Sequence, residues 1–304
     1  AINSNMRAYQ SDQYSLPLPE NHRFPMHKYQ LLKEELIRNN ILTASQIHAA
    51  PLIEVEDLYL AHDRDYVDHI INGTLDPKEQ RKIGFPWSPT MPLRSRASVG
   101  GFMAASSYAL EHGFAGNLSG GTHHAHRASG GGFCVFNDFA VATHVLKQRF
   151  KVTQLAIVDL DVHQGDGNSS MLQGTPGVFI FSMHGEKNYP FKKVNSDLDI
   201  ALPNQCQDDE YLSKLSEALP KVFQTNPQII LYQAGVDPLF SDKLGHLALS
   251  FEGLKHRDRL VFEMCHEKGV PVAIAMGGGY AEPIEDSIRA HLNTYIVAKE
   301  LFSK

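Results

Sequence analysis

Cysteines, long apolar runs and targeting signals are all scarce in this sequence. Its three cysteines, Cys134, Cys206 and Cys265, lie far apart and form no C-x-x-C motif. That spacing is typical of reduced thiols and argues against a disulfide-stapled scaffold. No apolar stretch approaches the length of a membrane span, and no signal peptide is recognisable. We therefore expect a cytoplasmic protein, or a nuclear one if the source is eukaryotic.

A strong excess of one charge is also missing. The 28 basic and 34 acidic residues give a formal net charge of -6, which favours small molecules or peptides as partners over nucleic acid or a membrane. No Pro/Ser-rich linker or block of charge divides the 304 residues, so we predict a single domain over residues 6–304. Residues 1–5 precede Met6, and we expect them to be a remnant of cloning. Nothing in the sequence indicates an oligomeric state.

Apolar runs alternate with amphipathic segments, most regularly in the second half of the chain. This βα repetition predicts an α/β fold, a single domain in which helices flank a mostly parallel central sheet. The predicted strands are 117–119, a run that begins at Leu155, 178–183, 198–202, 229–234 and 272–276, and the predicted helices are 28–38, 58–72, 98–112, 138–149, 208–223, 251–268 and 284–302.

The strongest chemical signal lies in residues 155–167, LAIVDLDVHQGDG, where a buried strand changes abruptly to polar residues. Because side chains alternate along a strand, Asp159, Asp161 and His163 share a face. Loops beyond the carboxyl ends of parallel strands form the ligand crevice of such sheets, so these side chains and Asp166 should face one site. The alternative is a strand-end cluster that only caps the next helix.

A second acidic residue follows another apolar strand. Asp237 comes directly after residues 229–236, and together with Asp161 and His163 it makes a plausible three-ligand site for one divalent metal. Two carboxylates and one imidazole leave positions for water and substrate, as a catalytic zinc requires. A competing interpretation makes Asp237 a turn starter, because proline follows it.

Adjacent histidines follow a pair of glycines at His123 and His124. Neighbours in an extended segment point opposite ways, so acid/base roles are more natural for them than ligation of one metal. Asp159 and Asp166 are the predicted acceptors for their outer ring N–H groups. The alternative is that both are ordinary surface histidines.

Tyr280 follows three glycines, so its phenol is available to donate a hydrogen bond to a developing oxyanion, although a simple turn aromatic is the competing interpretation. We expect His126 and His184 to be ordinary surface histidines.

Six segments in order carry a family resemblance: GGTHHAHRASGGGFC, DLDVHQGDG, SMH, QAGVDP, DKLGHLALSFEG and GGGY. The chain resembles the zinc-dependent histone deacetylases of the arginase–deacetylase superfamily, and looks closest to class IV and its bacterial relatives. The resemblance implies hydrolysis of acyl-lysine amides at one Zn²⁺ per chain, a metal for which Fe²⁺ could substitute. The roles it implies are zinc ligation by Asp161, His163 and Asp237, general base for His124, electrostatic partner or acid for His123, oxyanion donor for Tyr280, and second-layer support for Asp159 and Asp166.

Family members also bind a monovalent cation beneath the zinc, and the resemblance implies a structural K⁺ at Asp159, Asp161, His163, Ser182 and Met183. The same resemblance makes Gly132 and Phe133 one wall of the substrate channel. Tyr189 stands where many members have phenylalanine in the opposite wall, which leaves the preferred acyl chain open.

Three alternatives to this function remain. Small acetylated amines such as acetylpolyamines are the second substrate class. A binuclear manganese ureohydrolase would need extra carboxylates, and the candidate positions hold Gly165 and Gly235. A non-catalytic acyl-lysine binder should have lost His123, His124 or Tyr280, all of which are present.

Overall fold

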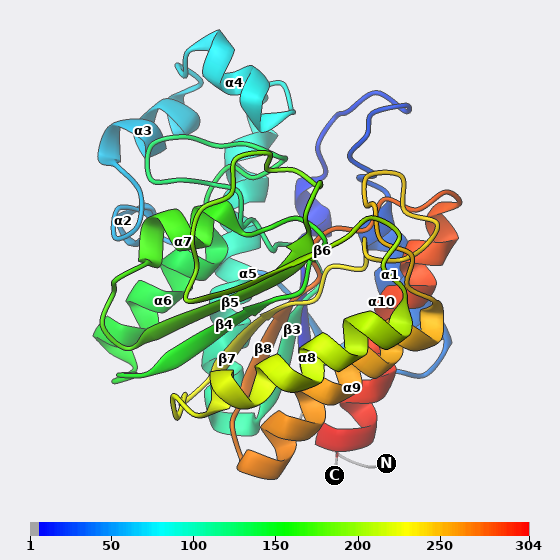
Figure 1. The fold of residues 1–304 in the computed structure, drawn as a ribbon. Coiled ribbons are helices and arrows are strands. Elements are labelled where there is room, and N and C mark those ends of the chain that lie inside the picture. Colours follow the sequence, from blue (N-terminus) through cyan, green and yellow to red (C-terminus); the bar gives the residue numbers. More distant parts are fainter. Residues whose placement is uncertain (1–5, 304) are drawn as a thin grey trace.

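Eight parallel strands form one sheet at the centre of the computed structural model, which describes residues 6–303 (Figure 1). The remnant expected at residues 1–5 lies outside the described residues. The order of the strands in the sheet is β2-β1-β3-β8-β7-β4-β5-β6, and every pairing of neighbouring strands is parallel. The strands are β1 Arg7–Gln10, β2 Ile47–Ala49, β3 Phe114–Asn117, β4 Leu155–Asp159, β5 Val178–Gly185, β6 Leu198–Leu202, β7 Ile230–Gln233 and β8 Val272–Ala275.

Helices cover both faces of the sheet. Figure 1 shows α1, α8, α9 and α10 on one face and α5, α6 and α7 on the other. The helices are α1 Lys28–Arg38, α2 Val55–Leu58, α3 Arg64–Asn72, α4 Pro77–Ile83, α5 Thr90–His112, α6 Asp138–Arg149, α7 Asp166–Leu172, α8 Asp208–Phe223, α9 Phe251–Lys268 and α10 Ile284–Phe302. This architecture confirms the predicted α/β fold with a flanked central sheet.

The packing of strand β4 explains why its sequence is apolar at successive positions. Ala156 and Val158 pack into the core beneath α8 and α9, whereas Leu155 and Ile157 pack into the core beneath α5 and α6. Each face of the strand is therefore buried under a layer of helices, as parallel sheets require.

The long amphipathic helices have the predicted bounds at 28–38, 208–223, 251–268 and 284–302. The helix predicted at 58–72 begins only at Arg64, as α3, because Asp63 has extended backbone and donates its N–H to Arg127 O; Leu58 is the last residue of the separate helix α2. Helix α5 begins at Thr90, eight residues before the predicted start at 98; it is buried on most sides and so lacks an amphipathic stripe. The strand predicted at 117–119 ends at Asn117. Among the described residues, no helix is long and apolar enough to cross a membrane.

Candidate active site

The three predicted metal ligands come together at the carboxyl edge of the sheet. Asp161 and His163 follow β4, and Asp237 follows β7, the strand hydrogen-bonded to β4. One ligand atom from each residue lies within 4.8 Å of the others, and His163 Nδ1 is 3.0 Å from both Asp161 Oδ1 and Asp237 Oδ2. All three side chains are buried. Among residues 6–303 no other such group of three potential ligands is present.

The chemistry of this buried group fits a divalent cation. Asp237 Oδ1 accepts the Val162 N–H, whereas Asp237 Oδ2 is buried, accepts no well-aligned hydrogen bond and faces His163 Nδ1 at 3.0 Å. Burial and the neighbouring Asp161 carboxylate raise the pKa of Asp237, as expected for two anions held together in a dry site. A side chain at Gly278 would collide with Asp237 Oδ2, so glycine keeps the space beside that oxygen open. A buried carboxylate oxygen that accepts no well-aligned hydrogen bond and lies beside an imidazole nitrogen fits a metal ligand by its chemistry.

Arg257 of α9 supports both ligand-bearing loops from below. This fully buried guanidinium donates to Gly235 O at 2.5 Å, Leu160 O at 3.3 Å and Ala234 O at 3.4 Å, and it pairs with Asp258. The backbone leading to Asp161 and to Asp237 is thus held by one side chain. Sequence reasoning missed Arg257, although a charged pair flanked by Leu254 and Val261 on the buried face of a helix was a readable signal.

The two adjacent histidines lie side by side, each on its own carboxylate. His123 Nδ1 is 2.5 Å from Asp159 Oδ2 and His124 Nδ1 is 2.7 Å from Asp166 Oδ1. Their ring centroids are 4.2 Å apart. The expectation that they would point opposite ways is wrong, because the chain here forms a turn and not an extended segment. Each outer nitrogen faces a carboxylate, so each Nε2 is the atom directed at the site.

The surroundings of His123 and His124 shift the pKa values of the two rings in opposite directions. Burial lowers the pKa of His123, but the adjacent Asp159 carboxylate outweighs it and raises that pKa to about 9. Burial, reinforced by the charge of His123, lowers the pKa of His124 to about 4. One ring therefore favours the cation and the other the neutral base, a division of roles typical of acid/base pairs.

Of the two histidines predicted on the surface, His126 is partly exposed but contacts the site, and His184 is buried, contrary to the prediction. His126 Nε2 lies 2.8 Å from Asp166 Oδ2, so Asp166 contacts two imidazoles, which sequence spacing alone did not indicate. His184 is 2% exposed, and its Nδ1 lies 2.9 Å from Ser182 Oγ. Ser182 is the register partner of Asp159 on the neighbouring strand, at the place where the monovalent cation is predicted.

Tyr280 lies at the edge of the same site, after β8. Its ring centroid is 6.5 Å from that of His163, and its backbone N–H donates to Asp242 Oδ2. Burial raises the pKa of the phenol well above its ordinary value, so the hydroxyl keeps its proton and remains a donor. Lys28 Nζ donates to Gly277 O and Gly279 O, which fixes the glycine loop that carries Tyr280.

The predicted channel residues line a mouth of about 340 Å³ that reaches His124 and His163. Tyr189 lies edge-on to His124, with ring centroids 4.9 Å apart. Phe133 adopts a left-handed backbone, φ +66°, a strained conformation for an aromatic residue. At Gly132, φ is +52° and a Cβ would lie 2.7 Å from His124 Cδ2. This wall therefore depends on glycine next to His124.

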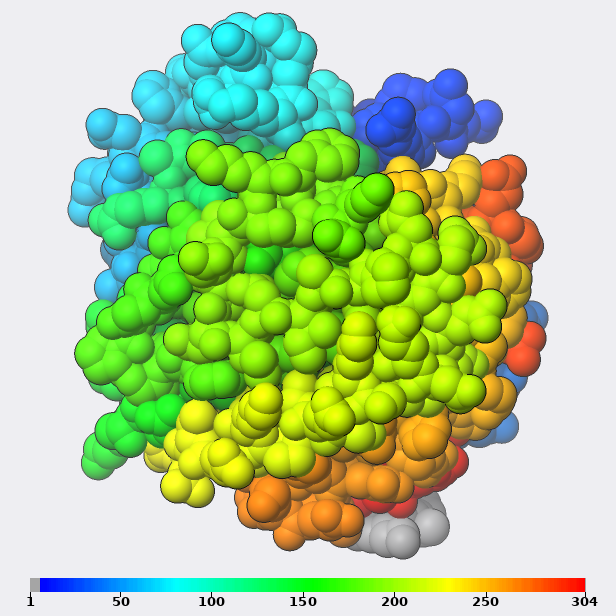
Figure 2. Space-filling view, in the orientation of Figure 1, coloured from blue at the N-terminus to red at the C-terminus, as the bar shows by residue number. Residues whose placement is uncertain are grey.

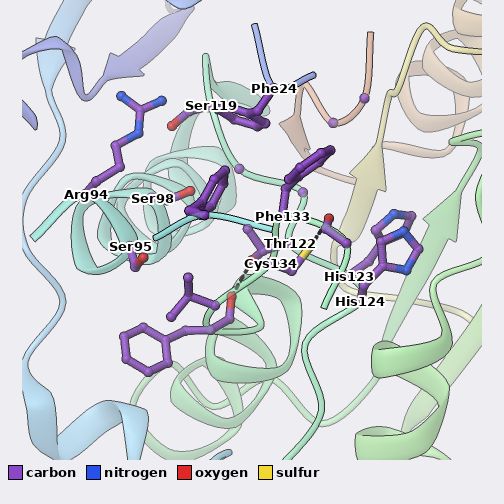
Figure 3. A pocket seen from close by; sticks show the side chains of 18 of the residues that line it. Phe24, Arg94, Ser95, Ser98, Ser119, Thr122, His123, His124, Phe133 and Cys134 are labelled. Carbon is purple, nitrogen blue, oxygen red and sulfur yellow. Dashed lines mark hydrogen bonds between the residues drawn. The ribbon is translucent and has the colours of Figure 1, made fainter. Parts of the chain in front are cut away.

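A small internal cavity of about 70 Å³ continues behind the histidines. Figure 3 shows Arg94, Ser98 and Ser119 on the side of it away from His123 and His124. Arg94 is buried and donates to Ser11 O at 3.0 Å. The cavity thus leads from the histidine pair to a buried cation.

An eight-stranded parallel sheet carries the buried Asp–His–Asp group beside the two His–Asp pairs, and its fold is arginase/deacetylase-like. Sequence comparison narrows this fold class: residues 22–295 match the histone deacetylase domain, and the chain belongs to the histone deacetylase family.

Several relatives and solved structures are similar over most of the chain. An uncharacterized protein of Picosynechococcus is 44% identical over 95% of this chain and 97% of its own length. Histone deacetylase 2 of Arabidopsis thaliana is 31% identical, covering 88% of this chain and 73% of the relative. The acetoin utilization protein AcuC of Bacillus subtilis is 28% identical over 90% of this chain and 75% of its own. A structure of a histone deacetylase homologue from Aquifex aeolicus, 24% identical, superposes with a TM-score of 0.81 over 98% of this chain and 84% of the other; this last likeness shows the fold.

Proposed function

We propose that this protein hydrolyses the side-chain amide of acyl-lysine in peptides or proteins, with one zinc ion held by Asp161, His163 and Asp237. The observation that carries the proposal is the pair of histidines, each braced by a carboxylate, beside that buried ligand group. Zinc, when bound, would polarise the amide carbonyl and lower the pKa of the attacking water. Ferrous iron suits the same ligands.

The protein groups account for the proton transfers. Since His124 Nδ1 faces Asp166, its Nε2 takes the proton of the water whose oxygen attacks the carbonyl carbon. Tyr280 donates its hydroxyl hydrogen bond to the oxyanion that forms. When the C–N bond breaks, the His123/His124 pair returns a proton to the departing amine. The products are a carboxylate and the free amine of lysine.

The walls of the mouth suit a long aliphatic side chain. Phe133 and Tyr189 contribute aromatic surface to one opening that ends at His124 and His163. An extended lysine side chain is apolar up to its acylated nitrogen, so aromatic walls bury it while the amide reaches the polar end.

Two glycines support one metal over the two of a ureohydrolase. A side chain at Gly165 would collide with Asp159 Oδ2, and one at Gly235 would collide with Asp161 Oδ2. A further carboxylate ligand at either position would therefore require Asp159 or Asp161 to move.

We also propose K⁺ as a structural ion beneath this group. Asp159 and Ser182 place oxygen atoms on adjacent strands in register, with Met183 next along β5. Replacing potassium by tetramethylammonium in the buffer should lower thermal stability, and an unchanged melting temperature would oppose the assignment.

The test of the main proposal is hydrolysis by metal-depleted and metal-restored protein. Depleted protein should be inactive, and one equivalent of Zn²⁺ or Fe²⁺ should restore cleavage of acyl-lysine peptides, with one ion per chain by elemental analysis. His163→Ala should neither bind the ion tightly nor turn over. A need for two equivalents of manganese, or no cleavage of any acyl-lysine peptide, would refute the proposal.

A further inference from the structure

The mouth of the site is lined by cations and aromatic rings, and its lining contains no carboxylate among the described residues. Arg23 comes from the loop before α1 and Lys187 from the loop after β5, so two separate segments bring positive charge to one opening. Both side chains are exposed, and neither forms a salt bridge with any residue in 6–303. This local charge is opposite to the formal net charge of -6 on the whole chain.

The backbone beneath Lys187 is held in place. Asn188 Nδ2 donates to Leu244 O at 2.9 Å, and the His246 N–H donates to Asn188 Oδ1. Lys193 Nζ donates to Asn188 O and Pro190 O, which closes the loop on itself. Lys193 is thereby used internally, whereas Lys187 remains available to a ligand.

The loop that carries Arg23 is anchored by its neighbour. His22 Nε2 lies 2.9 Å from Gly84 O, next to the end of α4, and the Phe24 N–H donates to His22 Nδ1. Figure 2 shows this N-terminal loop, coloured blue, and α4, coloured cyan, projecting from the same end of the molecule. Arg23 is therefore presented from a fixed segment at the rim.

The nearby acidic groups Glu20, Glu186 and Glu282 lie outside the lining of the mouth, and Glu20 lines the adjoining groove together with Arg23. Glu186 is exposed next to Lys187 in the sequence but does not line the mouth. Glu282 pairs with Lys243 at 3.6 Å in the adjoining groove. Phe191, 85% exposed, adds an aromatic face to the same rim.

We propose that Arg23 and Lys187 select acyl-lysine substrates flanked by acidic side chains and disfavour polycationic acetylated amines. This inference rests on the proposed function, since it names the substrate class of the same site. A carboxylate near 4 Å from a cation in water gains roughly 1 kcal/mol, which corresponds to about five-fold in kcat/KM per contact.

The test compares peptides of one length in which the residues beside the acetyl-lysine are Glu, Gln or Lys. We expect kcat/KM to fall in that order, by about five-fold per step, mainly through KM. High salt should reduce the differences in kcat/KM among the three peptides, because exposed charges are screened. Acetylated spermidine should be a poorer substrate than the Glu peptide.

Matched variants locate the effect. Arg23→Gln with Lys187→Gln should bring the three peptides to similar kcat/KM, and Arg23→Glu with Lys187→Glu should reverse their order. The control is Lys221→Gln. Lys221 is exposed in the last turn of α8, which precedes the amino end of β7 and so lies far from the mouth. This variant should leave the order of the three kcat/KM values unchanged.

Peptide binding separates the two proposals. Fluorescein-labelled acetyl-lysine peptides titrated against the Tyr280→Phe variant report charge preference while turnover is slow. Equal affinity and equal kcat/KM for the three peptides would overturn the charge selection while leaving the amidohydrolase intact. Tighter binding of the Glu peptide without turnover by the wild-type protein would support the selection and refute the proposed hydrolysis.

Discussion

Replacing Arg257 by methionine should both destabilise the protein and weaken its hold on the metal. The guanidinium is fully buried and pairs with Asp258 at 2.9 Å. Removing one partner of a buried pair leaves an uncompensated charge and costs about 3–5 kcal/mol. Tyr232 and Thr294 also donate to Asp258, at 2.6 and 2.5 Å. We therefore expect the loss in free energy of unfolding to lie at the lower end of this range, about 3 kcal/mol.

A second substitution separates stability from positioning. Adding Asp258→Asn to Arg257→Met removes the orphaned charge and should recover about half of the lost stability. It does not restore the donors to Gly235 O and Leu160 O, so the loops that carry the ligands stay unsupported. Metal affinity should therefore remain about 10- to 100-fold below wild type in both variants.

Urea denaturation of the metal-free proteins measures the first effect, and competition with a chromophoric zinc chelator measures the second. Arg257→Lys is the conservative control: it keeps the charge and one donor and should lie between the wild type and Arg257→Met in both assays. Wild-type metal affinity in the double variant would refute the positioning role and leave Arg257 with a stabilising one only.

Three further predictions concern single side chains. Tyr280→Phe should lower turnover of an acetyl-lysine peptide about 10²- to 10³-fold with unchanged metal content and melting temperature; wild-type turnover would make Tyr280 a turn aromatic. Asp166→Asn should slow turnover about 10- to 100-fold and alter the pH–rate profile, because His124 loses its carboxylate; an unaltered profile would limit Asp166 to a structural role. Burial lowers the pKa of His62 from 6.5 to about 4. Between pH 6.5 and pH 4 this histidine is therefore protonated in the unfolded chain and neutral in the folded protein. Stability from this group should be complete above pH 6.5 and fall by about 3 kcal/mol as the pH drops to 4; His62→Gln should flatten that dependence in urea titrations, and an equal slope in both proteins would contradict it.

Local pattern was enough to predict the long elements of this fold. The helix at 251–268 and the strand that begins at Leu155 carry strong periodicity or continuous burial, and the structure places them where predicted. Strands β1 and β2 have four and three residues, too few to show a period. They exist because β1 pairs with β2 on one side and with β3 on the other, long-range contacts that no local pattern contains.

In the candidate site too, some residues could be grouped from the sequence and others could not. Asp161, His163 and Asp237 could be grouped in advance because each follows a strand at one edge of a parallel sheet. The contact between His126 and Asp166 spans 40 residues and depends on the turn that follows Gly121. The position of Arg257 on the buried face of a helix could be read from the sequence, but the backbone carbonyls that it contacts could not.

The place of β8 in the sheet has a consequence for the order in which the protein is made. Strand β8 lies between β3 and β7 and is the only strand that joins β2-β1-β3 to β7-β4-β5-β6 among the described residues. Its partner Phe114 precedes Val272 by 158 residues (272 minus 114), about 8–30 s of synthesis at typical ribosome speeds. Through that interval the edge of β3 that will meet β8 stays open and accessible to chaperones or to aggregation. The glycine loop beside Asp161 also follows β8, so a nascent chain can complete the surroundings of the metal site only after residues 277–280 have left the ribosome.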